Sequence, residues 1–164
     1  MGQTGGGLRT WWRQLHGSDA NLTAPSRRHS AKYRVYCVVG DGESNEGQVW
    51  EAAASASHHR LDNLTAILDH NRFQSTGATA KKLDMLSFAE KFRSFGWEVR
   101  EIDGNDMRAI VEALDWAVTV PGKPQVIIAH TIKGKGVPSY ENTNCHFMKI
   151  TDDVLAICQE ALKG

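Results

Sequence analysis

The sequence predicts an α/β domain in three layers, with a parallel sheet at the centre and helices on both faces. Two observations predict this fold. From about residue 33 onward, short apolar runs of strand length alternate with segments of helical pattern, the order produced by parallel strands with helical crossovers. Polar turns rich in glycine follow several of these runs, and the carboxyl ends of parallel strands share one edge of a sheet. We therefore expect the chemistry of the chain at that edge.

Composition restricts the class of protein. The chain has 164 residues, of which 41% are hydrophobic and 23% charged, which is typical of one soluble globular domain. Nineteen basic residues balance nineteen acidic ones, so no overall charge favours nucleic acid or membrane as a partner. Three cysteines (Cys37, Cys145 and Cys158) lack metal-binding spacing, which predicts a reducing, cytoplasmic location.

Residues 1–32 are predicted to form an atypical, flexible N-terminal segment, separate from a domain at residues 33–164. This stretch contains three consecutive glycines, Trp11 beside Trp12, and a polar, arginine-bearing run with Pro25. It shows neither the helical nor the alternating apolar period that would predict a regular element.

The first elements of the domain are a strand and a helix joined by a tight turn. Arg34 to Val39 reads as a buried strand, and the turn Gly40-Asp41-Gly42 ends it. Glu46 to His58 then reads as a helix with a small-residue face formed by Val49, Ala52, Ala53 and Ala56. Glycines let backbone N–H groups approach a phosphate, and the start of a helix attracts negative charge. The turn therefore predicts a binding site for a phosphorylated ligand.

A second strand, Asn63 to Asp69, completes a strand-helix-strand unit whose two strands run parallel. Asp41 and Asn71 both follow the carboxyl end of a strand, so their side chains can reach one ion. A carboxylate beside a phosphate is favourable when Mg2+ lies between them, since Mg2+ binds a few protein oxygens together with phosphate and water. A backbone carbonyl from residues 72–74 could supply a third protein ligand.

The rest of the chain continues the alternation. We expect a loop at 75–83, a helix from an Asp84 cap to Phe95, a strand at 97–102, a helix over 107–118 after an Asp106 cap, a strand at 125–129, and a last helix capped by Thr151. The inner side of that last helix is predicted to comprise Val154, Leu155, Cys158, Ala161 and Leu162. The segment His130 to Val137 reaches the same edge as Asp41. Its two lysines could close over a phosphorylated ligand, or the segment could be a mobile solvated loop.

A longer pattern identifies a family. The stretch GDGESNEGQVWEAAASASHHRLDNLTAILDHNRFQ closely resembles the thiamine-diphosphate motif of transketolases. The GDG turn and the later asparagine both match, as do EGxxWEA, RLDNL and the final DxN-x-x-Q. HTIKGKGV resembles the family segment that leads to a histidine beside the cofactor, and His146 stands at about that position. The resemblance runs from about Tyr33 to about His146.

The resemblance implies a site with thiamine diphosphate held through Mg2+. Its implied metal ligands are Asp41, Asn71 and the carbonyl of Phe73. The implied cofactor contacts are Gly40, Asp41, Gly42, Glu43, Asn71, Gln74 and His146, with the N–H of Gly42 on the diphosphate. His146 and Glu51 are the candidates for catalysis. For Glu46 and Glu51 a role in subunit contact or proton relay competes with that of an ordinary helix acid.

In this family a pyrimidine-binding domain supplies the glutamate that activates the cofactor, and no such domain fits in this chain. The resemblance therefore implies the diphosphate-binding subunit of a split transketolase. With a pyrimidine-domain partner, in a homodimer, heterodimer or larger assembly, it would transfer a two-carbon ketol unit between sugar phosphates. One alternative is a catalytically incompetent transketolase-like protein with an interaction or structural role, because residues 1–32 contain no GSLGQG-type turn. The α-type subunit of a thiamine-dependent dehydrogenase is another, though RLDNL and NRFQ favour transketolase.

Overall fold

The computed structural model of the protein describes residues 33–163. Four parallel strands form the central sheet in the order β1-β2-β6-β5. Their bounds are Val35–Gly40 for β1, Leu64–His70 for β2, Glu98–Asp103 for β5 and Gln125–His130 for β6. The strands predicted from the sequence are confirmed. The segment predicted to be flexible, residues 1–32, lies outside the described residues.

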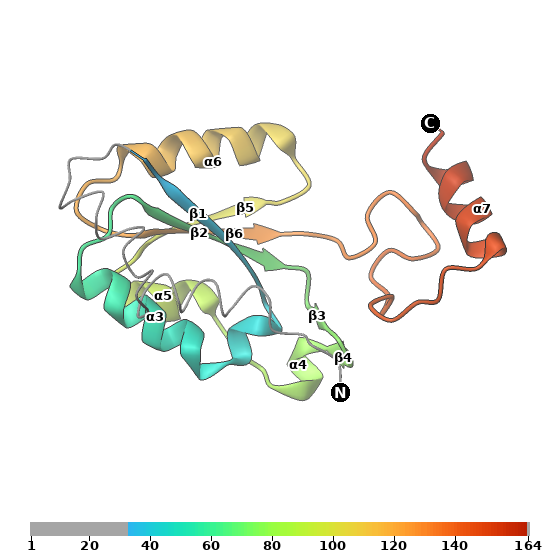
Figure 1. Ribbon diagram of the computed structural model, residues 1–164, viewed down its shortest axis with the longest axis horizontal. Coiled ribbons are helices and arrows are strands. Elements are labelled where there is room, and N and C mark those ends of the chain that lie inside the picture. The colour runs from blue at the N-terminus through green and yellow to red at the C-terminus, as the bar shows by residue number, and fades with distance from the viewer. Residues whose placement is uncertain (1–32, 164) are drawn as a thin grey trace.

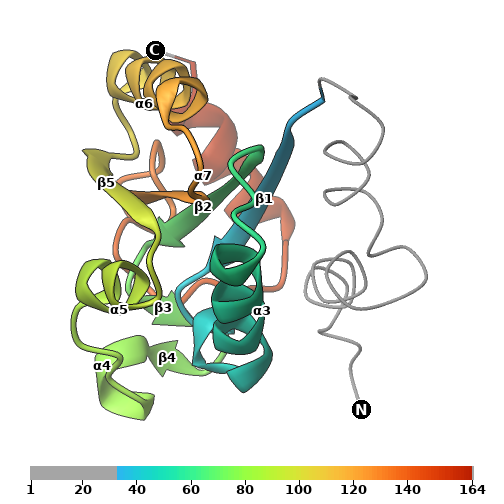
Figure 2. The ribbon, with the colours of Figure 1, turned by 90° about the vertical axis from the view of Figure 1, so that its left-hand side faces the viewer.

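Helices cover both faces of this sheet. Helix α3 (Gly47–His58) and helix α5 (Phe88–Ser94) lie on one face, and α6 (Met107–Thr119) lies on the other, as Figures 1 and 2 show. The main core lies between the sheet and the first pair, and a smaller cluster around Ala113, Ala117 and Ile127 lies under α6. The predicted three-layer α/β fold is therefore confirmed.

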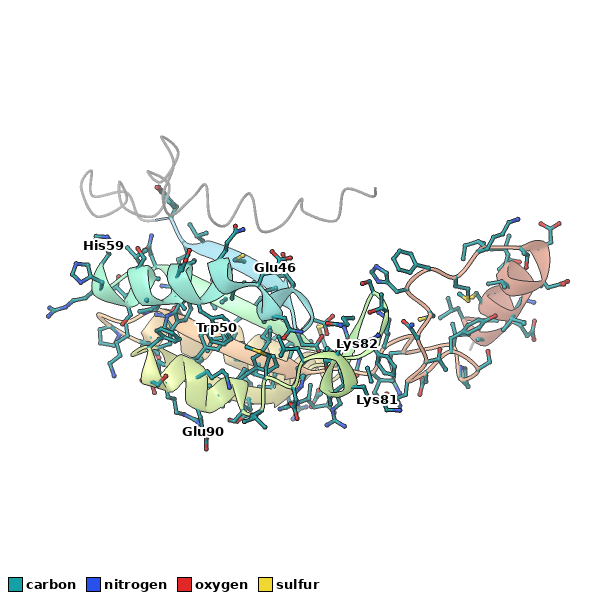
Figure 3. The ribbon with its side chains drawn as sticks, turned by 90° about the horizontal axis from the view of Figure 1, so that it is seen from below. Glu46, Trp50, His59, Lys81, Lys82 and Glu90 are labelled. Atoms are coloured by element: carbon teal, nitrogen blue, oxygen red, sulfur yellow. The ribbon has the colours of Figure 1, made fainter. Side chains whose placement is uncertain are left out.

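The packing of α3 follows the predicted small-residue face. Val49, Ala52, Ala53 and Ala56 are all buried. Trp50 lies between α3 and α5 (Figure 3), with its ring centroid 5.1 Å from that of Phe92. Its indole N–H donates to the carbonyl of Ser44 over 2.9 Å. This bond ties the start of α3 to the turn after β1, which is where the sequence predicts ligand binding.

The segment between β2 and α5 differs from the prediction. In place of a loop it contains the antiparallel strands β3 (Phe73–Gln74) and β4 (Gly77–Ala78), followed by the short helix α4 (Thr79–Lys82). Strands of two residues are too short to show an alternating pattern. The cap of α5 is Ser87, whose hydroxyl accepts from the N–H of Glu90 over 3.1 Å. Asp84 instead accepts from the N–H of Leu86 and shapes a turn. A 3-10 turn at Glu43–Asn45 was also missed.

The last helix, α7 (Asp152–Ala161), begins at the predicted cap, because the hydroxyl of Thr151 accepts from the N–H of Val154. Its predicted inner side, however, is not buried. The chain leaves the sheet after β6, and α7 stands well away from it (Figure 1). An amphipathic pattern predicts that a helix needs a partner, but it does not say that the same domain provides one.

Cys37, Cys145 and Cys158 are free thiols. Burial, with a smaller contribution from Glu43, raises the pKa of Cys37 to about 12, which makes this strand cysteine a poor nucleophile.

Within residues 33–163, no helix has both the length and the apolar character needed to cross a bilayer.

A buried polar network that the sequence did not predict fixes the amino-terminal end of the sheet. Gln125 is fully buried, and its side-chain oxygen accepts from Arg34 over 2.9 Å and from Thr65 over 3.0 Å. Its amide group donates to the carbonyls of Asp62, over 3.0 Å, and Lys123. Every hydrogen-bonding position of this side chain is therefore used.

Gln125→Leu should lower the free energy of unfolding by about 3 kcal/mol, because it removes four bonds and leaves their buried partners without a replacement. Denaturant unfolding measures this change. Gln48→Leu, at an exposed position of α3, is the matched control and should stay within about 0.5 kcal/mol of the parent. Equal stability of the two variants would contradict a structural role for the network.

Candidate functional site

The turn after β1, the loop after β2 and the segment after β6 together enclose a pocket of about 610 Å³. The residues that line it are Gly40, Asp41, Gly42, Glu43, Glu46, Asn71, Phe73, Gln74, Ser75, Lys133 and His146. All the predicted metal and cofactor residues are in this set. Of the two residues predicted to act in catalysis, His146 lines the pocket, whereas Glu51 is exposed on α3 and does not.

Asp41 lines this pocket and is buried and hydrogen-bonded. The backbone register pairs Gly40 with Asp69, which sets the turn after β1 beside the end of β2. The Asp41 side chain is only 1% exposed. Its two oxygens accept from the backbone N–H groups of Gly42, over 2.7 Å, and Arg72, over 2.5 Å. The carboxylate thus joins the two loops that follow the two strands.

Burial makes this carboxylate costly to charge. It raises the pKa of Asp41 to about 6, and the nearby Asp69 adds to the rise. The bonds from Arg72 and Gly42 and the charge of Lys133 act in the opposite direction. A divalent cation bound beside Asp41 would lower this pKa again, because it favours the charged form of a neighbouring carboxylate. The electrostatics of Asp41 therefore fit a cation-binding position.

Asn71 is oriented by its neighbours in the chain. Its side-chain oxygen accepts from the N–H of Phe73 over 2.9 Å, and its amide group donates to Asp69 over 2.9 Å. Asp69 also accepts from the hydroxyl of Thr131 in the segment after β6. Sequence analysis missed Asp69 as a positioning residue and read it only as the end of a strand. The signal available was its place two residues before Asn71, in the DxN pattern.

Gly42 is required by a close approach of the backbone. A Cβ atom at this position would lie 2.5 Å from the Cβ of Gln74 and 3.2 Å from its Cα. The resemblance implies that the Gly42 N–H contacts a diphosphate, but in the structure this N–H donates to Asp41. That implied contact therefore requires the N–H to be shared between a phosphate and the carboxylate.

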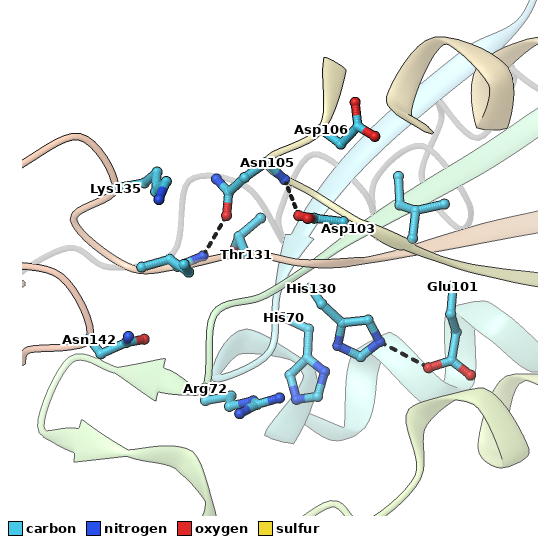
Figure 4. Close-up of a pocket in the computed structure, with 12 residues that line it drawn as sticks. His70, Arg72, Glu101, Asp103, Asn105, Asp106, His130, Thr131, Lys135 and Asn142 are labelled. Carbon is cyan, nitrogen blue, oxygen red and sulfur yellow. Dashed lines mark hydrogen bonds and ion pairs between the residues drawn. The ribbon is translucent and has the colours of Figure 1, made fainter. Parts of the chain in front are cut away.

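A larger pocket, of about 810 Å³, lies at the carboxyl ends of β2, β5 and β6 and was not predicted. Figure 4 shows His70 and His130 there, with ring centroids 5.1 Å apart, and His130 paired with Glu101 at 3.0 Å. Burial lowers the pKa of His70, and His130 and Arg72 lower it further. Within residues 33–163, no group of three or more His, Cys, Asp or Glu side chains could hold a metal ion, so this cluster is not a metal site of that type.

Residues 14–162 match the family model described as "Transketolase, thiamine diphosphate binding domain". The chain belongs to the transketolase family. The family resemblance of the GDG-to-Asn motif is thus confirmed, and the parallel sheet is the sheet of a transketolase thiamine-diphosphate-binding domain.

Two curated relatives and one solved transketolase structure are also similar to this chain. The mouse (Mus musculus) protein named transketolase-like protein 2 is 45% identical over 112 residues, which is 68% of this chain and 18% of the relative. The 6-deoxy-6-sulfo-D-fructose transketolase subunit SqwG of Clostridium sp. (strain MSTE9) is 43% identical over 121 residues, covering 73% of this chain and 44% of the relative. The crystal structure of transketolase from Campylobacter jejuni superposes with a TM-score of 0.74 at 28% identity, over 95% of this chain and 23% of that one.

This transketolase domain therefore spans less than half the length of these relatives. Its pocket fits the family cofactor in two respects. Asp41, Asn71 and Phe73 line one cavity, and a carboxylate, a side-chain amide and a backbone carbonyl are oxygen donors that suit Mg2+. Gly42 keeps the turn free of a side chain where Gln74 approaches it.

Proposed function

We propose that the protein is the diphosphate- and Mg2+-binding subunit of a two-chain transketolase. With a pyrimidine-domain partner it would transfer a two-carbon ketol unit between sugar phosphates, in the cytoplasm. The observation that carries the proposal is the single pocket lined by Asp41, Asn71, Phe73 and His146. The existence of a relative that is itself named a transketolase subunit, SqwG, supports a separate diphosphate-binding chain.

Each lining residue has a role that its chemistry allows. Asp41 and Asn71, with the carbonyl of Phe73, would hold Mg2+ against the diphosphate. Lys133 and His146, which line the same pocket, would bind phosphate oxygens. Gly40, Glu43 and Gln74 would shape the turn, since Glu43 accepts from the N–H of Gly40 over 3.2 Å and Gln74 accepts from Asn45 over 3.2 Å. The cofactor, when bound, supplies a nucleophilic carbon and an electron sink for two-carbon transfer.

Glu51 has a different proposed role. It is exposed on α3 and does not line the pocket. An exposed acid of this kind suits contact with another subunit better than contact with the cofactor held here. We propose that Glu51 acts at a subunit interface, where a proton relay to the pyrimidine domain could begin.

The second candidate function is a transketolase-like protein without catalysis. One observation favours it: Cys145 and Phe147 flank His146 where the resemblance to the ENxxxWHG segment of transketolases would place a tryptophan and a glycine, and Phe147 is 72% exposed. Relatives named transketolase-like proteins also match this chain.

Calorimetric titration of the full chain with thiamine diphosphate separates the two functions. The titration is run with and without Mg2+, and with and without a purified transketolase pyrimidine-domain chain from the same source. We expect binding that needs Mg2+ and becomes stronger with the second chain, and ketol transfer from a ketose phosphate to an aldose phosphate by the pair. Absence of binding under all four conditions would leave only the non-catalytic role.

A further inference from the structure

A cavity of about 180 Å³, which we call the α6 cavity, lies between α6 and the face of the sheet that α6 covers. Strands β2, β5 and β6, helix α6 and the residues just after β5 and β6 all contribute to its lining. The lining residues are Ile67, Asp69, Ile102, Gly104, Ile110, Leu114, Ile127, Ala129 and Thr131. None of them lines the pocket that contains Asp41 and Asn71. The α6 cavity is therefore a separate space.

The cavity exists because one side chain in the middle of the sheet is short. The strand register places Ala129 of β6 between Asp69 of β2 and Ile102 of β5. Helix α6 contributes Ile110 and Leu114, which are about one helical turn apart and so share a face. The side chain of Ala129 ends at its Cβ, so space is left between this row of the sheet and the helix.

The carboxyl end of the cavity is closed by tight packing. A Cβ added at Gly104 would lie 2.5 Å from the Cγ2 of Thr131 and 2.8 Å from the Cβ of Ala129. The N–H of Gly104 donates to the carbonyl of His130 over 2.9 Å. These contacts hold the turn after β5 against the end of β6. The cavity is thus a gap between well-packed elements, and such a gap persists because the surrounding structure relaxes only in part.

The α6 cavity offers few hydrogen-bonding groups to water. Among the described residues that line it, only Asp69 and Thr131 have polar side chains. The hydroxyl of Thr131 donates to Asp69, which also accepts from Asn71 over 2.9 Å. A buried water needs roughly two to four polar partners, and both of these side chains are already engaged. The space therefore suits an apolar molecule better than water.

We propose that the α6 cavity binds a small apolar molecule of about six carbon atoms, for which benzene is the probe. Apolar cavities of about 150 Å³ stay dry and take up benzene or xenon. Ile67, Ile110 and Leu114 are partly exposed, so a ligand can enter beside α6. With so few atoms, the dissociation constant should be on the order of 1 mM. Binding here requires neither Mg2+ nor thiamine diphosphate, so its test does not depend on the proposed function.

Methyl labelling of the isoleucines in the full chain, followed by NMR, tests the site directly. Benzene should shift, by its ring current and in a saturable way, the methyl resonances of the isoleucines that line the cavity. These are Ile67, Ile102, Ile110 and Ile127. Ile128 is the internal control, because it is 1% exposed and belongs to the main core on the other face of the sheet. Its methyl resonance should not shift. Dioxane, a polar ring with the same number of atoms, should shift none of them at the same concentration.

A variant that fills the space should lose the ligand. Ala129→Leu adds carbon atoms inside the cavity, so benzene should bind at least tenfold more weakly and should no longer raise the melting temperature as it does for the parent. Ala80→Leu, at an exposed position of α4, is the matched control and should bind within twofold of the parent. If Ala129→Leu does not fold, Ile110→Trp fills the same space from the helix and should give the same loss.

Three results would overturn the proposal. Benzene could leave all the lining methyl resonances unshifted. It could shift Ile128 as much as the lining isoleucines, which would indicate general partition into the protein. A folded variant with a filled cavity could bind benzene as the parent does, which would place the ligand elsewhere. None of these results concerns the Mg2+-dependent binding of thiamine diphosphate, so failure of this proposal is distinguishable from failure of the proposed function.

Discussion

Replacement of Asp41 by alanine should abolish the Mg2+-dependent binding of thiamine diphosphate and leave the fold intact. The side chain provides the only carboxylate in the proposed metal set, and loss of a charged ligand should weaken binding by roughly a hundredfold or more, about 2.8 kcal/mol. The fold should survive for a specific reason. Alanine leaves the N–H groups of Gly42 and Arg72 without acceptors, but it also removes a buried charge, and the two effects offset each other.

Calorimetric titration with thiamine diphosphate and Mg2+ measures the loss, and thermal unfolding of the metal-free protein checks the fold. Asp103→Ala is the matched control. Asp103 also ends a strand of the same sheet, but it lines the other pocket, so this variant should bind like the parent. Parent-like binding by the Asp41 variant would show that the metal assignment is wrong.

The same carboxylate makes cofactor binding depend on pH. Because the pKa of Asp41 is raised to about 6 in the metal-free fold, a proton competes with Mg2+ below that pH. Affinity for Mg2+ should be constant above about pH 7 and fall by up to about tenfold per unit below pH 6. The stability of the metal-free fold depends on pH in the opposite direction to the affinity for Mg2+. The folded state holds this proton more tightly than the unfolded state, so the contribution of Asp41 to stability is full below pH 3.8 and is lost as the pH rises through 6.

The sequence predicted the parts of the site that depend on local pattern. The buried face of α3 followed from helical spacing, and the meeting of Asp41 and Asn71 at one pocket followed from a single crossover between adjacent parallel strands. Neither prediction needed the order of the whole sheet. Both depend on residues within about thirty positions of each other, where the chain has few alternative paths.

The parts that were missed depend on non-local geometry. His70 and His130 meet because β6 inserts between β2 and β5 in the sheet, an order that the alternation of strands and helices does not encode. The bond from Arg72 to Asp41 depends on a left-handed backbone conformation at Arg72, with φ of 68°. Arginine does not favour that conformation, so no local preference predicts it. The exposed face of α7 could not be predicted either, because an amphipathic pattern does not say whether other described residues cover it.

Gly42→Ala should have the second large effect, and for a steric reason. The added methyl group would lie 2.5 Å from the Cβ of Gln74, so the β3-β4 hairpin must move away from the turn. We expect the free energy of unfolding to fall by about 2 kcal/mol. Phe73 and Gln74 move with the hairpin, so affinity for thiamine diphosphate with Mg2+ should fall by roughly tenfold or more.

Gly47→Ala is the matched control, since nothing lies within 4 Å of a Cβ added at the first residue of α3. Alanine should stabilise that helix by up to about 1 kcal/mol and leave binding unchanged. Chemical denaturation and calorimetric titration measure both quantities. A Gly42→Ala variant as stable as the parent would show that the turn and the hairpin are free to separate.

A second substitution distinguishes the steric account from a loss of backbone freedom. Gly42 adopts φ of −66° and ψ of −37°, an ordinary right-handed conformation that alanine accepts without strain. If the clash alone destabilises Gly42→Ala, removal of the Cβ of residue 74 by Gln74→Gly should restore part of the lost stability. The restoration should be partial, because the Cα of residue 74 would still lie 3.2 Å from the added methyl group. The double variant should therefore be more stable than the sum of the two single changes predicts, by about 1 kcal/mol. Additive effects would mean that the two loops do not meet at this contact, and the site would then need another reason for its glycine.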